Sequence, residues 1–148
     1  MVAASQLPSP AEVANDAGLF AATWLYVLDK QKRSVPLRYN RVQRHYMQRR
    51  TPRDLVLKAR QFGFSTAIQG ELFRLATTGT ATTLTLSHED KSTQKLRRIT
   101  QRFYDHLPAD FRPARAYANA TLTTYPGYDS ECTVATAGNV NAGRGHSL

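Results

Sequence analysis

The sequence is poor in residues that form covalent or metal cross-links. Its 148 residues include one cysteine, Cys132, and four histidines. A single cysteine excludes an internal disulfide and a cysteine-based zinc site, and it favours a reducing compartment. The histidines are scattered without the spacing of metal ligands, so we predict no zinc site. No Ser-His-Asp or Cys-His arrangement with local support is evident either.

Long apolar runs are also missing. The apolar stretch at 17–28 is shorter than the roughly 20 residues that a transmembrane helix needs. Acidic residues precede this stretch, which is unlike a signal peptide. We therefore expect a soluble, cytoplasmic protein with no membrane partner. The length and the 41% hydrophobic content fit one domain with a packed core.

Acidic residues are few, and the basic residues are clustered. The chain has 20 Lys and Arg against 11 Asp and Glu, a net charge of +9. Eleven of the basic residues lie at 30–60, where the only acid is Asp54, and seven lie at 91–115. Aromatic residues are interleaved at Tyr39, Tyr46 and Phe103. Such tracts favour contact with a nucleic-acid backbone, and a solvated basic helix face is the alternative interpretation.

Capping residues and hydrophobic spacing predict helices that alternate with strands. Ser9 and Glu12 form a capping-box pattern, and helical spacing of apolar residues continues to Val27. Asn40 is predicted to cap a second helix that ends near Gln48. The remaining expected elements are a strand at 55–57, a helix at 66–76, a strand at 81–87, a helix at 91–106, and strands at 119–125 and 131–137. This alternation predicts an α/β sheet with parallel pairs that ends in a hairpin-like pair.

The loop at 58–66 looks like a phosphate-binding P-loop with its lysine displaced. In the pattern G-x-x-x-x-G-K-[ST], backbone N–H groups cradle phosphates, Lys reaches the outer phosphates and Ser or Thr binds Mg²⁺. Gly63 and Ser65 keep their places, Phe64 occupies the lysine position, and Lys58 stands where the first glycine would be. A strand-like run leads in and a helix-like run leads out. The alternative is a turn that carries Gly and Ser for backbone reasons alone.

This loop contains the groups that a bound triphosphate requires. A flexible lysine at position 58 can reach across the loop, and Arg60 adds a second cation. Ser65 opens the following helix, where exposed N–H groups and the helix dipole favour anions. The sequence therefore predicts a nucleotide site at the start of this helix.

Several segments resemble the large terminase subunits of tailed bacteriophages. Residues 57–66 resemble the deviant Walker A motif of that family, in which several members carry the lysine at the front of the loop. The segment at 40–44 resembles the family's upstream adenine-recognition segment, and 85–89 resembles the strand end after the first βα unit. The segments at 136–138 and 143–148 resemble the stretch that leads up to Walker B. The resemblance covers about residues 36–148.

The resemblance implies an ASCE-type P-loop NTPase fold, a Rossmann-like three-layer sandwich. The implied division is an N-terminal helical segment at 1–35 and a partial ATPase domain with an incomplete sheet at 36–148. It implies ATP and Mg²⁺ as ligands, with Ser65 on the metal and Lys58 on the β- and γ-phosphates. The implied nucleotide-binding set is Gln43, Lys58, Arg60, Gln61, Gly63, Phe64, Ser65 and Thr66. In this set Gln43 reads adenine, Arg60 senses the phosphates and the N–H groups around Gly63 form the cradle.

One further site residue follows from the same resemblance. Arg144 stands near where some family members place an arginine that reaches into a neighbouring subunit's site. The alternative for Arg144 is a loop arginine that contacts DNA or nothing. The alternative for Gln43 is a solvent-exposed helix residue.

The implied function is part of a motor that drives double-stranded DNA into a capsid in the bacterial cytoplasm. In that family the ATPase forms a homo-oligomeric ring and works with a small terminase subunit and the capsid portal. The Walker B acid, a catalytic glutamate and a nuclease domain follow, and none is found here. We therefore expect an N-terminal portion of a longer protein that is marginally stable and does not hydrolyse ATP alone. Two other functions stay open: a non-catalytic basic DNA-binding module with a structural loop, and a fragment of a helicase-like P-loop ATPase.

Overall fold

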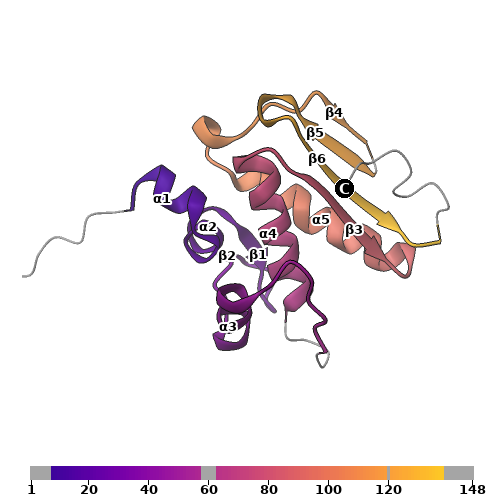
Figure 1. Ribbon diagram of the computed structural model, residues 1–148, viewed down its shortest axis with the longest axis horizontal. Helices are drawn as coiled ribbons and strands as arrows, with labels where there is room; N and C mark the ends of the chain where they lie inside the picture. The colour runs from indigo at the N-terminus through magenta and orange to yellow at the C-terminus, as the bar shows by residue number, and fades with distance from the viewer. Residues whose placement is uncertain (1–7, 58–62, 120, 139–148) are drawn as a thin grey trace, which may run out of the picture.

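The computed structural model describes residues 8–57, 63–119 and 121–138. This part is a mixed α/β fold (Figure 1). Its helices and strands are α1 Pro10–Asn15, α2 Ala17–Trp24, β1 Tyr26–Leu28, β2 Ser34–Pro36, α3 Arg41–Arg49, α4 Phe64–Thr78, β3 Thr82–Ser87, α5 Asp90–His106, β4 Tyr117–Ala118, β5 Leu122–Tyr125 and β6 Ser130–Thr136. Two short 3₁₀ turns, η1 Ala109–Phe111 and η2 Pro126–Tyr128, lie in the connections. None of the helices in this described part is long and apolar enough to cross a membrane.

The main sheet has four strands in the order β3-β6-β5-β4. β6 runs parallel to β3, with Thr85 opposite Val134, and antiparallel to β5. α5 forms part of the connection between the parallel strands, and η2 lies in the turn between β5 and β6. The predicted parallel pair and the predicted hairpin-like pair are both confirmed.

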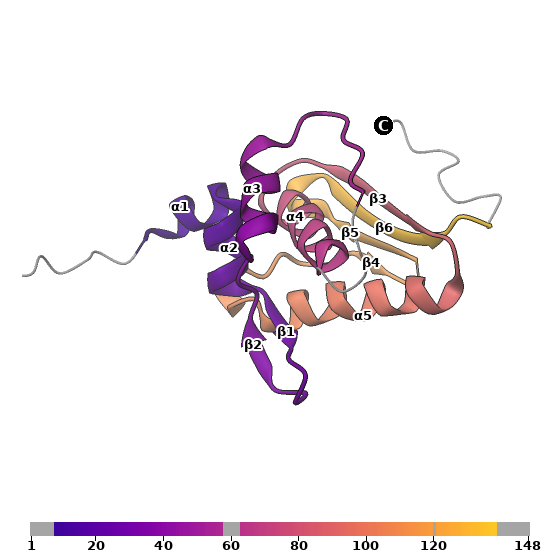
Figure 2. The ribbon, with the colours of Figure 1, turned by 90° about the horizontal axis from the view of Figure 1, so that it is seen from below.

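The helices α4 and α5 lie on the same face of this sheet (Figures 1 and 2). On that face Thr85 of β3 hydrogen-bonds to Gln69 of α4, and Thr136 of β6 hydrogen-bonds to Thr93 of α5. The N-terminal elements pack on the side of α4 and α5 that faces away from the sheet. The expected sandwich has helices on both faces of its sheet, whereas the helices of the described part cover one face.

The largest core cluster joins the N-terminal elements to α4 and α5. Phe20 and Leu25 pack with Phe73 of α4 and Phe103 of α5, and all four side chains are buried. Burying a side chain of this size contributes about 1.5–3 kcal/mol. The division expected at residue 35 falls inside β2, and this core draws residues from both sides of it.

The caps explain where the first helices begin and end. The predicted capping box is confirmed, because Ser9 accepts from the Glu12 N–H and Glu12 accepts from the Ser9 N–H. Asp16 then ends α1 and caps α2 by accepting from the Leu19 N–H, so one expected helix becomes two. The prediction that Val27 is helical is wrong: it lies in β1 opposite Val35 of β2. Branched and aromatic residues in this stretch suit an extended chain.

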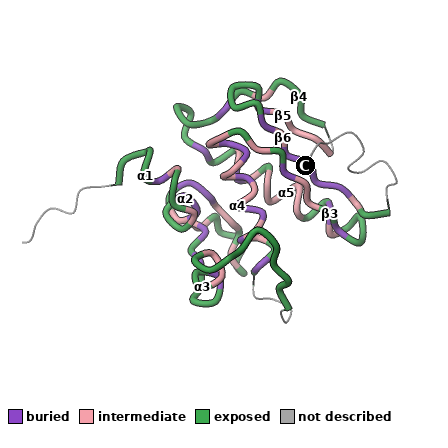
Figure 3. The backbone as a smooth tube through the Cα atoms, in the orientation of Figure 1, coloured by how far each residue is buried: buried purple, intermediate pink, exposed green. Residues whose placement is uncertain are grey.

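Two expected strands differ from the structure. The strand expected at 55–57 does not form, and the segment after α3 is exposed throughout (Figure 3). Leu55 is 100% exposed and Leu57 is 99% exposed. A strand needs a neighbouring strand to pair with its backbone groups, and no described strand pairs with this segment. Of the strand expected at 119–125, the part Leu122–Tyr125 forms β5, whereas Asn119 Oδ1 accepts from the Leu122 N–H in the turn that follows β4.

Candidate functional site

The N-terminus of α4 is built on a glycine in the left-handed region. Gly63 has φ of +66°, a conformation that L side chains rarely adopt, and it precedes Phe64 without offering a side-chain cap. The first N–H groups of a 15-residue helix therefore have no side-chain acceptor at Gly63. Such a terminus attracts anions through these N–H groups and the helix dipole.

Phe64, which occupies the lysine position of the P-loop pattern, is a packing residue. Its ring is buried and lies edge-on to Tyr46 of α3, with the ring centroids 5.6 Å apart. This contact anchors the start of α4 against α3. Packing against α3 thus explains why an aromatic side chain stands where the P-loop pattern has a lysine.

An ion-pair network fixes α3 and α4 relative to each other. Glu71 of α4 is 2% exposed and accepts from Arg50 Nη2 at 2.5 Å and Arg74 Nη2 at 2.7 Å. Arg74 Nη1 also donates to the backbone oxygen of Ala14 in α1, at 2.8 Å. The buried carboxylate therefore links the end of α3 to α4, and Arg74 extends the link to α1.

This arrangement places Gln43 against Gly63. Gln43 Oε1 accepts from the Asn40 N–H at 2.9 Å, and Asn40 Oδ1 accepts from the Gln43 N–H at 2.9 Å, so the pair caps α3. A Cβ atom on Gly63 would lie 2.9 Å from Gln43 Nε2. The interpretation of Gln43 as a solvent-exposed helix residue is wrong, because it is 5% exposed. The predicted cradle glycine and the predicted adenine reader are neighbours.

Two adjoining cavities surround the α4 N-terminus, and we call their combined surface the α4 groove. The larger has a volume of about 800 Å³ and extends from Gly63 to the carboxyl end of β3 at Ser87. The smaller, of about 650 Å³, extends from Gly63 to Asn40 and Gln43. The residues that line both cavities are Gly63, Thr66, Lys95 and Ile99. The carboxyl end of a parallel strand is where open α/β sheets bind ligands.

The described lining of the α4 groove carries positive charge. Lys95 of α5 lines both cavities, and Arg38, Arg98 and Arg102 line the smaller one. No Asp or Glu belongs to the described lining of either cavity. The α5 cations also form no ion pair with a described carboxylate. The groove is therefore suited to an anion.

Gln69 brings a buried amide to the same groove. Its side chain is 1% exposed, lines the larger cavity and accepts from Thr85 Oγ1 at 3.1 Å. Its Nε2 atom has no hydrogen-bond partner among the described residues. An unsatisfied buried donor costs about 1–3 kcal/mol, so an acceptor bound in the groove would recover that free energy.

The structure locates some of the predicted site residues and leaves others out. Ser65 and Thr66 line the larger cavity together with Phe64. Lys58, Arg60, Gln61 and Arg144 lie outside the described residues. The sequence analysis missed Lys95 and Gln69. One local signal was available, since Gln69 follows Ser65 by four residues and so shares its helix face.

The acidic groups near the carboxyl ends of β3 and β6 are engaged elsewhere. Asp90 Oδ1 accepts from Thr136 Oγ1 at 2.5 Å, and Thr136 Oγ1 is 2.9 Å from Thr93 Oγ1. Glu89 Oε1 accepts from Ser92 Oγ at 3.0 Å. No group of three His, Cys, Asp or Glu residues that could hold a metal occurs within the described ranges.

Neither models of known protein families nor curated proteins give a match to this chain.

Proposed function

We propose that the α4 groove binds a nucleoside triphosphate, ATP with Mg²⁺, and that the chain is the nucleotide-binding part of a DNA-packaging ATPase similar to phage terminase large subunits. The observation that carries the proposal is the meeting of four features in one groove. These are the start of α4, where Gly63 provides no side-chain cap, the Gln43 amide, the Lys95 cation, and Gln69 Nε2, which has no hydrogen-bond partner among the described residues. The motif resemblance at 57–66 supports the same ligand.

The described residues fit a bound nucleotide in size and chemistry. The larger cavity lies within the range of about 300–1,000 Å³ that is typical of small-molecule sites. Gly63 lets a ligand approach the backbone, since no Cβ covers its N–H. Ser65 is exposed at the first turn, where its hydroxyl is available to Mg²⁺. When bound, Mg²⁺ neutralises charge on the phosphates.

Double-stranded DNA is the proposed second partner. Lys91, Lys95, Arg98 and Arg102 recur along α5 at helical spacing, without ion pairs to described carboxylates. Neutralising DNA phosphates releases counterions, so DNA affinity should fall steeply with salt. The homo-oligomeric ring, the small subunit and the portal belong to this proposal through the terminase resemblance alone.

ATP titration by calorimetry, with and without Mg²⁺, tests the nucleotide proposal. We expect Lys95→Ala to weaken ATP binding by about tenfold, because one charge-assisted contact to phosphate is lost. Lys91→Ala is the matched control: it removes the same charge one turn earlier on α5, from a residue outside the groove lining. Equal losses in the two variants would point to general electrostatics rather than a defined site.

A second pair of measurements separates this proposal from the basic DNA-binding module. Absence of ATP binding by the unaltered chain, or binding that is indifferent to Lys58→Ala, would favour the module with a structural loop. Salt-dependent DNA binding is expected under both functions and therefore does not discriminate between them.

A further inference from the structure

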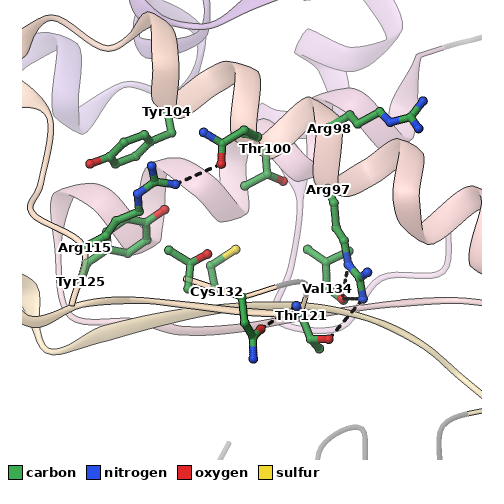
Figure 4. Close-up of a pocket in the computed structure, with 12 residues that line it drawn as sticks. Arg97, Arg98, Thr100, Tyr104, Arg115, Thr121, Tyr125, Cys132 and Val134 are labelled. Carbon is green, nitrogen blue, oxygen red and sulfur yellow. Dashed lines mark hydrogen bonds between the residues drawn. The ribbon is translucent and has the colours of Figure 1, made fainter. Parts of the chain in front are cut away.

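A further cavity lies between α5 and the strands β5 and β6 (Figure 4). Its volume is about 240 Å³, below the range of sites for whole nucleotides or drug-sized ligands. It shares only Arg98 with the α4 groove among their described linings. Cys132 and Tyr125 provide an apolar floor. The size suits a small ion or a single chemical group of a larger ligand.

Two guanidinium groups flank this floor. Arg97 donates through Nε and Nη2 to the Val134 carbonyl at 3.1 Å, and Nη2 also donates to Thr121 Oγ1 at 3.3 Å. On the other side of Cys132 in Figure 4, Arg115 donates through Nη1 to Gln101 Oε1 at 3.0 Å. The Arg115 guanidinium also lies 3.8 Å from the centroid of the Tyr104 ring. Both arginines are half-buried and held in place.

Both arginines retain N–H groups that can donate hydrogen bonds to a ligand. Arg97 Nη1 and Arg115 Nη2 have no hydrogen bond to another described residue. Neither arginine forms an ion pair with a described carboxylate, and no acid belongs to the described lining. Hydroxyls of Thr100 and Thr123 and the amide of Asn119 add neutral polar groups around the same space.

We propose that this cavity binds a phosphate group with a charge of about −2, either free inorganic phosphate or the terminal phosphomonoester of a nucleic-acid strand. Two guanidinium groups match the charge of about −1.5 to −2 that a phosphomonoester carries near pH 7. A backbone phosphodiester carries a single negative charge and a carboxylate does as well, so each matches the pair less well. The planar fork of arginine also suits phosphate oxygens. The site is independent of the nucleotide proposed for the α4 groove.

The first test is titration of the full chain at constant ionic strength with inorganic phosphate, a 5′-phosphorylated trinucleotide and its 5′-hydroxyl form. We expect Arg115→Gln to weaken phosphate binding by about tenfold. Arg49→Gln is the control, because Arg49 is exposed at the end of α3 and lines neither this cavity nor the α4 groove. Preference for the phosphorylated trinucleotide over phosphate identifies a strand end as the source, and equal binding identifies the free anion.

The second test monitors phosphate binding in the unaltered chain. Addition of phosphate should shift the Nε–H resonances of Arg97 and Arg115 in a nitrogen–proton NMR spectrum and leave that of Arg49 in place. This NMR measurement needs no variant, so it does not depend on whether a variant folds. No saturable binding, equal losses in Arg115→Gln and Arg49→Gln, or shifts confined to residues of the α4 groove would each overturn the proposal.

Discussion

Replacing Gly63 by alanine tests the geometry on which the α4 groove depends. A residue with a Cβ at φ of +66° is strained by about 1–2 kcal/mol. The new Cβ would also lie 2.9 Å from Gln43 Nε2, closer than such atoms normally approach. Gln43 would then move and weaken the α3 cap, which is worth about 1 kcal/mol. We expect Gly63→Ala to lower the free energy of unfolding by about 2–3 kcal/mol.

The assay is urea unfolding, monitored through the fluorescence of Trp24, which is the only tryptophan in the sequence. Gly79→Ala is the matched control, because Gly79 has φ of −166° and its Cβ would only reach ordinary contact, 4.0 Å from the Leu75 oxygen. That substitution should be neutral or slightly stabilising, since alanine restricts the unfolded chain.

A double-mutant cycle separates the backbone strain at position 63 from the steric clash with Gln43. Gln43→Ala removes the amide that the new Cβ would meet, so Gly63→Ala should cost about 1 kcal/mol less in that background. Gly63→Ala should weaken ATP binding as well, because the first N–H groups of α4 are displaced. A cost no larger than that of Gly79→Ala, or strict additivity in the cycle, would refute the proposed contact between α3 and the start of α4.

Three further outcomes are expected. Glu71→Ala should destabilise the fold by about 3 kcal/mol in denaturant titration, because it leaves two arginines without their buried carboxylate, whereas exposed Glu89→Ala should cost under about 0.5 kcal/mol. Burial raises the pKa of Tyr39 to about 12, so the unfolded chain loses this proton first. The Tyr39 contribution to stability should fall by up to about 2–3 kcal/mol between pH 10 and 12. Tyr39→Phe should remove that part of the loss, and the part due to Tyr125, whose pKa burial also raises, should remain. Burial also raises the pKa of the Cys132 thiol, so alkylation followed by mass spectrometry should be slow until urea unfolds the chain, and rapid labelling of the native chain would contradict its burial.

Local signals predicted the helices well. Ser9 and Asn40 cap helices where their side chains suggested, because a cap depends on residues within one turn. The predicted helix at 66–76 begins earlier, at Phe64, because Gly63 turns the chain into it directly. Asp16 is a cap too, but its place inside an apolar helical pattern concealed the break between α1 and α2.

Strand formation and the composition of the groove were less accessible from sequence. The run Leu55-Val56-Leu57 is apolar, yet a strand exists only where another strand supplies hydrogen bonds, and local composition does not report that. Gly63 and Ser65 could be selected because the P-loop pattern is contiguous. Lys95 reaches the same groove from α5, and its position depends on how that helix packs on the sheet.

The sheet order has a consequence for the sequence of folding events. β6 is the last described strand in the chain, yet it lies between β3 and β5 and is the sole link that joins them in the described sheet. During synthesis β3 therefore has no strand to pair with until Thr136 has left the ribosome. Until then α4 and α5 expose the surface that will face the sheet, including Ala76 and Tyr104, which pack against Tyr125 and Cys132 in the folded chain. Assembly of the sheet is thus a late, long-range step, which is the kind of event that slows folding and extends exposure to aggregation.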